Sequence, residues 1–298
     1  MKILIVGLKK NEQLKRLKAE GEKRGHEVRG CYTSELTIRV GRNNFDPTLR
    51  GEPLTQFDLI YIWSVGKRRW EWYTAAHWLS KKGVKIVYEK TISPDYLYYL
   101  TPAIDYLRQH ENNLPFPKSA VLFDARSVES IIANFEFPLI MKISGGRQGR
   151  GVFMLEDQKD LEDKIKELKD VSPSFVIREF IPNDGDIRVF TVGYKAIGAM
   201  KRMATVEGEF RSNISQGGKG EVFDLDSRPE IREIAEKLSK ITRTEIAGVD
   251  IMIHKETGQP YILEINPGPQ FMGLEEYTNT NAALEIIKYF ESLVKEDK

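Results

Sequence analysis

The sequence predicts a mixed protein in which a small open α/β domain precedes a larger α+β part. Three observations lead to this fold class. The first residues alternate short β-rich runs with helix-like segments, which is typical of parallel strands. Later apolar runs come in pairs with glycine-rich or turn-rich links, which is typical of antiparallel hairpins. The chain has 298 residues, 41% of them hydrophobic and 30% charged, which suffices for about two domains.

The composition narrows the function classes. Lys and Arg number 45 against 44 Asp and Glu, and the formal net charge of +1 argues against a general DNA-binding protein. No apolar run approaches the roughly 20 residues of a membrane-spanning helix, and the N-terminal run is too short for a signal peptide. We therefore expect a cytoplasmic protein with no membrane partner. Cys31 is the only cysteine and the four histidines are not paired, which disfavours disulfides, zinc sites and an activated thiol.

The N-terminal α/β domain is expected to span residues 1–92. Gly7 follows the first strand, but the further glycines of a dinucleotide-binding fingerprint are missing, so a plain turn is favoured. Trp63, Trp70 and Trp72 lie beside cationic residues, and this mixture favours a core with a basic loop over a surface that stacks a nucleobase. Strands are predicted at 3–6, 26–31, 57–62 and 84–88, with helices after the first strand and at 75–82.

A proline-rich segment at 93–118 is the expected domain boundary, so the second domain spans 93–298. Pro94 fits the first turn of a helix, whereas Pro102 would interrupt that helix. The part at about 93–178 is expected to carry a glycine-rich lid, and the part at about 179–298 an acidic hairpin. Strands are predicted at 121–123, 138–143, 152–155, 175–181 and 186–192, and helices at 127–134 and 158–169.

The first candidate site is a glycine-rich loop between two strands. Lys142 ends the first strand, and four glycines follow within ten residues. Glycines let backbone N–H groups approach an anion closely, and Lys142 adds a positive charge. A phosphate-binding loop and a mobile, charged hairpin tip both remain open. The loop contains Gly145, Gly146, Arg147, Gln148, Gly149, Arg150 and Gly151.

The second candidate site is a predicted hairpin that turns at Thr257. This fold sets Asp250 opposite Glu264, and strand alternation puts Asn266 on the same face as Glu264. Two carboxylates and an amide oxygen suit Mg²⁺ or Mn²⁺. Because buried acids need a partner, a metal site is favoured over an exposed polar face. The strands are 247–253 and 261–267, and the side chains expected in the core are Ile251, Leu263 and Ile265.

Three arginines lie in or beside apolar stretches between these two sites, namely Arg188, Arg202 and Arg211. Arginine recognises carboxylates and phosphates through two parallel hydrogen bonds. Each of the three could instead cover apolar neighbours with its aliphatic stem. Together with the glycine loop and the acids, they favour a site for an anionic substrate.

From about residue 93 to its C-terminus the chain resembles the ATP-grasp superfamily, and most closely its RimK-like branch of amino-acid ligases, which includes ribosomal-protein glutamate ligases. The resemblance implies a pre-ATP-grasp α/β domain followed by an ATP-grasp module of two α+β subdomains. Its motifs stand in the family's order. They are the strand and loop from Pro138 to Gly151, Glu179-Phe180-Ile181, Gly185-Asp186-Ile187-Arg188, Phe210-Arg211-Ser212-Asn213, Ala247-Gly248-Val249-Asp250-Ile251 and Leu263-Glu264-Ile265-Asn266.

The resemblance also implies roles for the matched residues. ATP would be bound by Lys142, Gly145, Gly146, Gln148, Gly149, Gly151, Glu179, Phe180, Ile181, Asp186, Arg211, Ser212 and Asn213. Lys142 and the loop would contact the phosphates, the 179–181 segment the adenine, and Asp186 the ribose. The implied ligands of two Mg²⁺ or Mn²⁺ ions are Asp250, Glu264 and Asn266. The implied catalytic residues are Arg202, Arg188 and Lys142, beside the reacting carboxylate and the transferred phosphoryl group.

Two segments depart from the family pattern. Many members carry a lysine where this chain has Asp95-Tyr96-Leu97. Close relatives often read Asn-x-Ser-Pro-Gly after the acidic motif, whereas this chain reads Asn266-Pro267-Gly268-Pro269-Gln270-Phe271. That second segment borders the acceptor site, so the family's glutamate specificity is not carried over.

The function implied is an ATP-dependent carboxylate–amine ligase. The carboxylate becomes an acylphosphate, and an amine then displaces phosphate to form an amide or peptide bond, with ADP and phosphate released. The expected partners are an amino acid, a peptide or a small carboxylate, including a protein C-terminus or a cofactor. A phosphotransferase acting on a hydroxyl and a non-catalytic nucleotide-binding regulator are the alternatives. A homodimer and a homotetramer both remain open.

Overall fold

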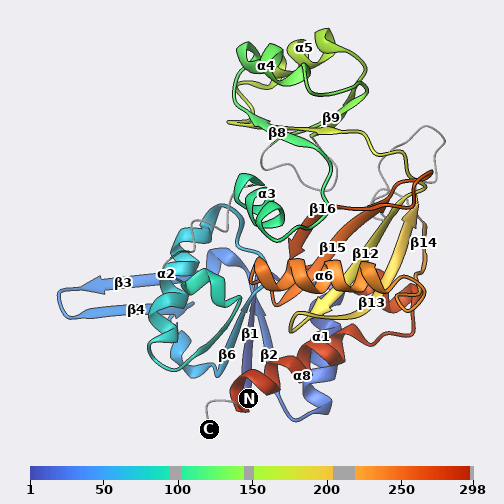
Figure 1. Ribbon diagram of the computed structural model, residues 1–298. Helices are drawn as coiled ribbons and strands as arrows, with labels where there is room; N and C mark the ends of the chain where they lie inside the picture. Colours follow the sequence, from blue (N-terminus) through green and yellow to red (C-terminus); the bar gives the residue numbers. More distant parts are fainter. Residues whose placement is uncertain (94, 96–101, 144–150, 204–218, 296–298) are drawn as a thin grey trace.

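The protein mixes parallel and antiparallel sheets with covering helices, as the sequence predicts (Figure 1). The computed structural model describes residues 1–93, 95, 102–143, 151–203 and 219–295. Within these ranges the strands form four sheets. Two of the sheets, a four-stranded one and a five-stranded one, concern the candidate site.

The N-terminal sheet is parallel and has the strand order β2-β1-β6-β7. Gly7 has φ +90°, and a Cβ at this residue would lie 2.0 Å from the carbonyl oxygen of Ser64, so the turn after β1 requires glycine. Trp63 and Trp72 are buried in the cores, which confirms the core interpretation for both, while Trp70 is half exposed. The elements are β1 (Lys2–Val6), α1 (Glu12–Lys23), β2 (Glu27–Cys31), β6 (Leu59–Ile62), α2 (Arg69–Ser80) and β7 (Lys85–Val87).

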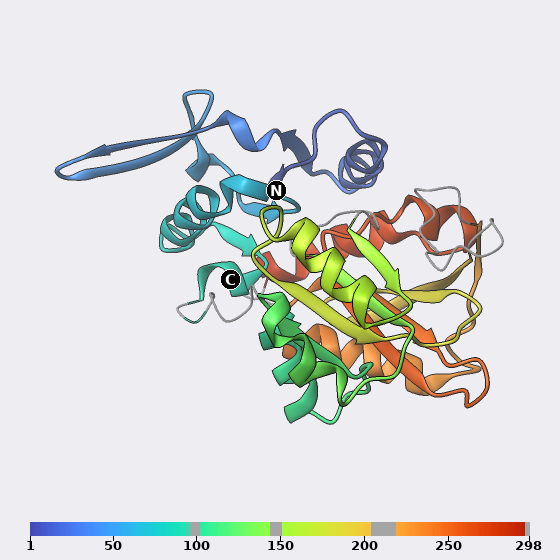
Figure 2. The ribbon, with the colours of Figure 1, turned by 90° about the horizontal axis from the view of Figure 1, so that it is seen from above.

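An antiparallel arm leaves this domain between β2 and β6, and both ribbon views show it projecting from the body (Figures 1 and 2). It contains β3 (Leu36–Gly41), β4 (Asn44–Leu49) and β5 (Glu52–Pro53). Local sequence patterns predict no strand in this segment. Pro47 lies inside β4, and a proline is usually read as evidence against a strand.

The lid sheet has the order β10-β9-β11-β8 and is antiparallel. The predicted hairpin of β9 and β10 is confirmed. Leu139, Met141, Phe175 and Ile177 form its core with residues of α4 and α5, which cover one face. The elements are α3 (Pro102–Glu111), which begins at Pro102 and precedes the sheet, then β8 (Ser119–Leu122), α4 (Val128–Ile132), β9 (Leu139–Ile143), β10 (Val152–Leu155), α5 (Gln158–Leu168) and β11 (Phe175–Glu179).

The central sheet has the order β14-β13-β12-β15-β16. One face packs on α6 through residues such as Ile231, Leu238, Val249 and Ile251. The other face is free of α6 and turns toward the lid sheet (Figure 1). The elements are β12 (Asp186–Val192), β13 (Lys195–Met203), β14 (Lys219–Val222), α6 (Pro229–Ile241), β15 (Ile246–Ile253) and β16 (Pro260–Pro267).

A bulge in the β15–β16 hairpin corrects one prediction. The register shifts between Asp250 and Ile251, so that Ile251 pairs with Ile262. Ile262 and Ile265 therefore join the core under α6, while Leu263 is half-buried and outside that core cluster. The expectation that Leu263 faces the core is wrong, because the extra residue of a bulge breaks the alternation of faces.

The C-terminal helices α7 (Met272–Tyr277) and α8 (Ala282–Lys295) bring the chain back to its N-terminal domain, where α8 lies beside α1. One core cluster combines Ile3 and Tyr61 with Phe190, Phe271 and Phe290. No helix in the described part of the chain is long and apolar enough to cross a membrane.

Candidate functional site

Strand register gathers charged residues on the α6-free face of the central sheet. Arg188 of β12 lies opposite Asp250 of β15, and Asp250 lies opposite Glu264 of β16. Asp186 of β12 lies opposite Arg202 of β13. Because residues two apart on a strand share a face, Asp186 and Arg188 point the same way. The predicted pairing of Asp250 with Glu264 is confirmed.

Asp250 is the centre of an ion-pair network, and its side chain is only 5% exposed. Arg188 donates from Nε to Oδ1 at 2.7 Å and from Nη2 to Oδ2 at 2.6 Å. Nη2 of Arg202 lies 3.0 Å from Oδ1. Burial alone would raise the pKa of Asp250, but Arg188 and Arg202 hold it well below its usual range. The carboxylate is therefore ionised and fixed between two guanidinium groups.

Arg202 continues the network to Asp186. Its Nε donates to Oδ2 of Asp186 at 3.0 Å, and its Nη2 contacts the same oxygen. Both side chains are buried. Burial opposes the charge of Arg202, but Asp250 and Asp186 raise its pKa above the usual value. A permanent positive charge thus stands between two carboxylates.

Glu264, Asn266 and Lys142 lie next to this network. Nδ2 of Asn266 donates to Oε1 of Glu264 at 3.0 Å and to Oδ2 of Asp250 at 3.2 Å. Nζ of Lys142, at the end of β9, lies 3.6 Å from Oε2 of Glu264. This contact joins the lid sheet to the central sheet. Burial and the charge of Arg178 lower the pKa of Lys142, and Glu264 opposes the effect.

The three predicted metal ligands converge on one place. The amide nitrogen of Asn266 lies between the carboxylates of Asp250 and Glu264, as a cation would. Rotation of this amide by about half a turn would offer its oxygen to the same place. No group of three His, Cys, Asp or Glu side chains that could hold a metal occurs among the described residues. The predicted donor set differs from such a group, because it consists of two acids and an amide. Such oxygen donors fit Mg²⁺, which combines one or two carboxylates with water and phosphate oxygens.

The predicted nucleotide-binding residues fall into two groups. Glu179 ends β11, and its Oε1 accepts the backbone N–H of Lys118 at 2.7 Å. The 179–181 segment therefore lies at the end of the lid sheet, where the chain leaves it for β12. Gly151 has φ +86°, and its carbonyl oxygen accepts the N–H of Ile143 at the end of the hairpin. The remaining residues of the glycine loop and three further predicted ATP contacts lie outside the described part of the chain. They are Gly145, Gly146, Arg147, Gln148, Gly149, Arg150, Arg211, Ser212 and Asn213.

Arg178 is a residue to which the sequence analysis gave no role. It lies in β11 and is 5% exposed. Its Nη2 donates to the hydroxyl of Tyr106 at 2.7 Å and to the carbonyl oxygen of Leu263 at 3.0 Å. The signal in the sequence was a charged residue inside the apolar run 175–181.

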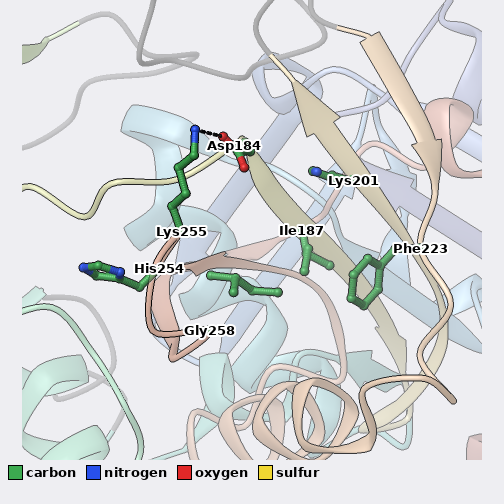
Figure 3. Close-up of a pocket in the computed structure, with 9 residues that line it drawn as sticks. Asp184, Ile187, Lys201, Phe223, His254, Lys255 and Gly258 are labelled. Atoms are coloured by element: carbon green, nitrogen blue, oxygen red, sulfur yellow. Dashed lines mark ion pairs between the residues drawn. The ribbon is translucent and has the colours of Figure 1, made fainter.

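A cavity of about 200 Å³ lies on the other face of the central sheet (Figure 3). Ile187 and Lys201 line it and alternate along their strands with Asp186 and Arg202, so the sheet itself separates the cavity from the ion-pair network. Lys255 forms an ion pair with Asp184 at its edge, at 3.0 Å. This cavity is therefore not the predicted nucleotide site.

Cys31 is excluded as a nucleophile. It is fully buried in the core of the N-terminal domain. Burial and the nearby charge of Glu35 raise the pKa of its thiol to about 12. A thiol in this state is neither ionised nor accessible.

Comparison with known proteins identifies the family of this arrangement. The model of the RimK-like ATP-grasp domain matches residues 103–290. A probable alpha-L-glutamate ligase of Vibrio vulnificus is 32% identical over 299 residues, covering 97% of this chain and 95% of its own. A protein of the same name from Legionella pneumophila is 31% identical over 300 residues, covering 94% and 92%.

Solved structures share the fold over the whole chain. The ATP-grasp ligase PsnB, complexed with a phosphomimetic variant of its minimal precursor, Mg and ADP, superposes with a TM-score of 0.75 at 18% identity and covers 98% of both chains. The D-alanine–D-alanine ligase of Bacillus anthracis, complexed with ATP, gives a TM-score of 0.70 at 16% identity and covers 100% of both chains.

Proposed function

The chain belongs to the RimK-like ATP-grasp family, and from that premise we propose that it is an ATP-dependent ligase that joins a carboxylate to an amine and releases ADP and phosphate. The observation that carries this proposal is the convergence of Asp186, Arg188, Arg202 and Asp250 on one sheet face, opposite Lys142 of the lid sheet. Opposed charges of this kind suit a polyanionic nucleotide and a carboxylate substrate.

ATP binds between the lid sheet and the central sheet in this proposal. Lys142 contacts the phosphates. Its ammonium group extends from the lid sheet to Glu264 of the central sheet, and so lies between the two sheets. The 179–181 segment holds the adenine where the chain passes from one sheet to the other, and Asp186 meets the ribose. Residues 1–92 form the N-terminal domain and 93–298 the ATP-grasp module, with the glycine loop and Arg211 to Asn213 near the phosphates.

Asp250, Glu264 and Asn266 hold the Mg²⁺ that accompanies ATP. Bound Mg²⁺ supplies neutralisation of charge on phosphate oxygens. Arg188 fixes the orientation of Asp250 through two hydrogen bonds. Asn266 completes the oxygen donors once its amide has rotated.

The residues of this site supply positioning and positive charge, and no protein nucleophile is required. Arg202 and Lys142 stabilise negative charge that develops on the transferred phosphoryl group, while Arg188 faces the reacting carboxylate. The carboxylate leaves this step as an acylphosphate, which the amine attacks. Release of phosphate then completes the amide bond.

The acceptor is an amino acid or a peptide in this proposal, and L-glutamate is the first amine to test, because curated relatives carry the name alpha-L-glutamate ligase. The segment after Asn266 borders the acceptor site. Gly268 in this segment donates its N–H to the hydroxyl of Tyr88 at 2.6 Å, so the N-terminal domain fixes it.

The test is phosphate release from ATP and Mg²⁺, screened over pairs of amino acids, peptides and small carboxylates. A ligase releases phosphate only when both substrates are present, and mass spectrometry of the product identifies the amide bond. A product that retains the phosphoryl group would identify a phosphotransferase instead. No ADP formation across a broad panel would favour a non-catalytic nucleotide-binding protein and contradict the proposal.

A further inference from the structure

Arg178 is a buried cation that has no ion-paired acid in the part of the chain that the structure describes. Its side chain lies inside the protein at 5% exposure, and it forms no ion pair with a carboxylate among the described residues. Its two side-chain hydrogen bonds to described residues come from Nη2, to the hydroxyl of Tyr106 and to the carbonyl oxygen of Leu263. The buried Nε has no hydrogen-bond partner in the described part of the chain.

The register shows which way Arg178 points. Arg178 pairs with Ile140 and Val176 pairs with Lys142, so Arg178 and Lys142 share one face of the lid sheet. The opposite face carries the core covered by α4 and α5. Contacts with Leu263 and Glu264 of β16 confirm that Arg178 and Lys142 both face the central sheet.

The energetics require an anion near Arg178. A guanidinium group does not lose its proton in proteins, and burial of an unpaired charge is costly. The neighbouring acids are already engaged, since Asp250 pairs with Arg188 and Arg202 and Glu264 contacts Lys142. Arg178 and Lys142 share one face of the lid sheet, and each contacts β16, Arg178 at Leu263 and Lys142 at Glu264. Such a pair suits a polyanionic ligand.

We infer that Arg178 binds a phosphate oxygen of the nucleotide through its Nε–H, beside Lys142. This inference rests on the proposed function and adds a phosphate ligand to it. The two Nη2 bonds orient the guanidinium group, and Tyr106 is therefore a positioning residue. Because Nη2 is engaged with Tyr106 and Leu263, Nε–H is the buried donor left for the ligand.

The experiment measures equilibrium binding of ATP, ADP and adenosine to the full chain with Mg²⁺, by displacement of a fluorescent ADP analogue. The variants are Arg178→Met, Arg178→Lys and Tyr106→Phe. Arg126→Met is the matched control, because Arg126 is an exposed arginine of the same subdomain, paired with Asp124. Unfolding temperatures without nucleotide are recorded for every variant.

Loss of a hydrogen bond to a charged group predicts that Arg178→Met raises the Kd of ATP and of ADP by about tenfold or more. The Kd of adenosine, which has no phosphate, should change less than about threefold. Arg178→Lys keeps the positive charge but loses the planar set of guanidinium donors. Its Kd of ATP should lie between those of the wild type and Arg178→Met. Tyr106→Phe should raise the Kd of ATP less than Arg178→Met does. The Kd values of Arg126→Met should equal those of the wild type.

Two results would overturn the inference. An ATP Kd within about threefold of wild type in Arg178→Met would mean that Arg178 only fastens the lid sheet to β16. An equal loss of affinity for ATP and for adenosine in Arg178→Met would place Arg178 at the nucleoside and not at the phosphates. Should Arg178→Met fail to fold, the same comparison is decided by Arg178→Lys. A wild-type chain that binds no ATP would instead refute the proposed function, whereas normal wild-type binding with an unaffected variant refutes Arg178 alone.

Discussion

Replacement of Asp250 by Asn separates the structural role of this carboxylate from its predicted role as a metal ligand. The substitution keeps the shape of the side chain and removes its charge. Arg188 then loses its two hydrogen bonds to a carboxylate, and Arg202 loses one of its two carboxylate contacts among the described residues and keeps the one with Asp186. Breaking a buried ion pair by removing one partner costs about 3–5 kcal/mol. At about 2 °C per kcal/mol for a chain of this size, the unfolding temperature should fall by about 6 °C or more.

Glu264→Gln is the matched control for Asp250→Asn. It removes an acid from the same predicted metal site, but the Glu264 side chain is 48% exposed and its ion pair with Lys142 spans 3.6 Å. Because Glu264 is half exposed and the contact is long, the pair should contribute only about 0–1 kcal/mol. Both variants should lose Mg²⁺-dependent ADP formation, while calorimetry should show a large loss of stability only for Asp250→Asn.

Equal unfolding temperatures for the two variants would refute the assignment of Asp250 as the centre of the network. Full turnover in either variant would refute the metal site. The double variant Arg188→Met with Asp250→Asn provides a further check, because it removes the unpaired cation together with the acid. It should be less destabilised than the sum of the two single variants.

Three other regions give further predictions. Burial raises the pKa of Glu245 to about 7, so its contribution to stability is complete below its unfolded pKa near 4.5 and is lost as the pH rises through 7. Glu245→Gln should therefore stabilise the protein by up to about 3 kcal/mol at pH 8 and hardly at all at pH 4.5, and an equal gain at both pH values would contradict this explanation. Cys31 should react with a thiol reagent at pH 8 only after unfolding in urea, and stoichiometric labelling of the native protein would show that its burial is wrong. Gly268 has φ +60°, and a Cβ there would lie 2.3 Å from the carbonyl oxygen of Trp63. Gly268→Ala should therefore lower the free energy of unfolding by about 1–3 kcal/mol and raise the KM of the acceptor. An unchanged unfolding temperature would show that the added methyl group meets no steric clash.

Local sequence patterns predict most strands that build the site. The β-rich runs 138–143 and 152–155 correspond to β9 and β10, and the runs about Asp250 and Glu264 correspond to β15 and β16. Counting outward from the turn at Thr257 predicts the correct partner of Asp250, although the bulge lies between the turn and that pair. The pairs nearer the turn are offset by one residue from this count, and the extra residue of the bulge brings Asp250 opposite Glu264. The same count fails at Leu263, since a bulge has no clear signature in this sequence.

The charge pairings could not be predicted from sequence. The resemblance to the family implies that Arg188 and Arg202 lie beside a substrate, and the structure adds that both contact Asp250. These partners lie about 50 to 60 positions apart along the chain, and β12 separates the strand of Arg202 from that of Asp250, so spacing carries no information about the pairs. Arg178 illustrates the same limit, because only the folded chain reveals that this cation is buried and pairs with no acid among the described residues.

The hydroxyl of Tyr88 has a consequence for attempts to recombine this protein with its relatives. It donates to the carbonyl oxygen of Ile246 and accepts the N–H of Gly268, both at 2.6 Å, from a position just before the predicted domain boundary. A chimera joined at residue 92 would therefore exchange the support of the acceptor segment together with the first domain. Grafts that change the substrate should transfer Trp63, Tyr88 and the segment around Gly268 as one unit, because their shapes are matched to each other.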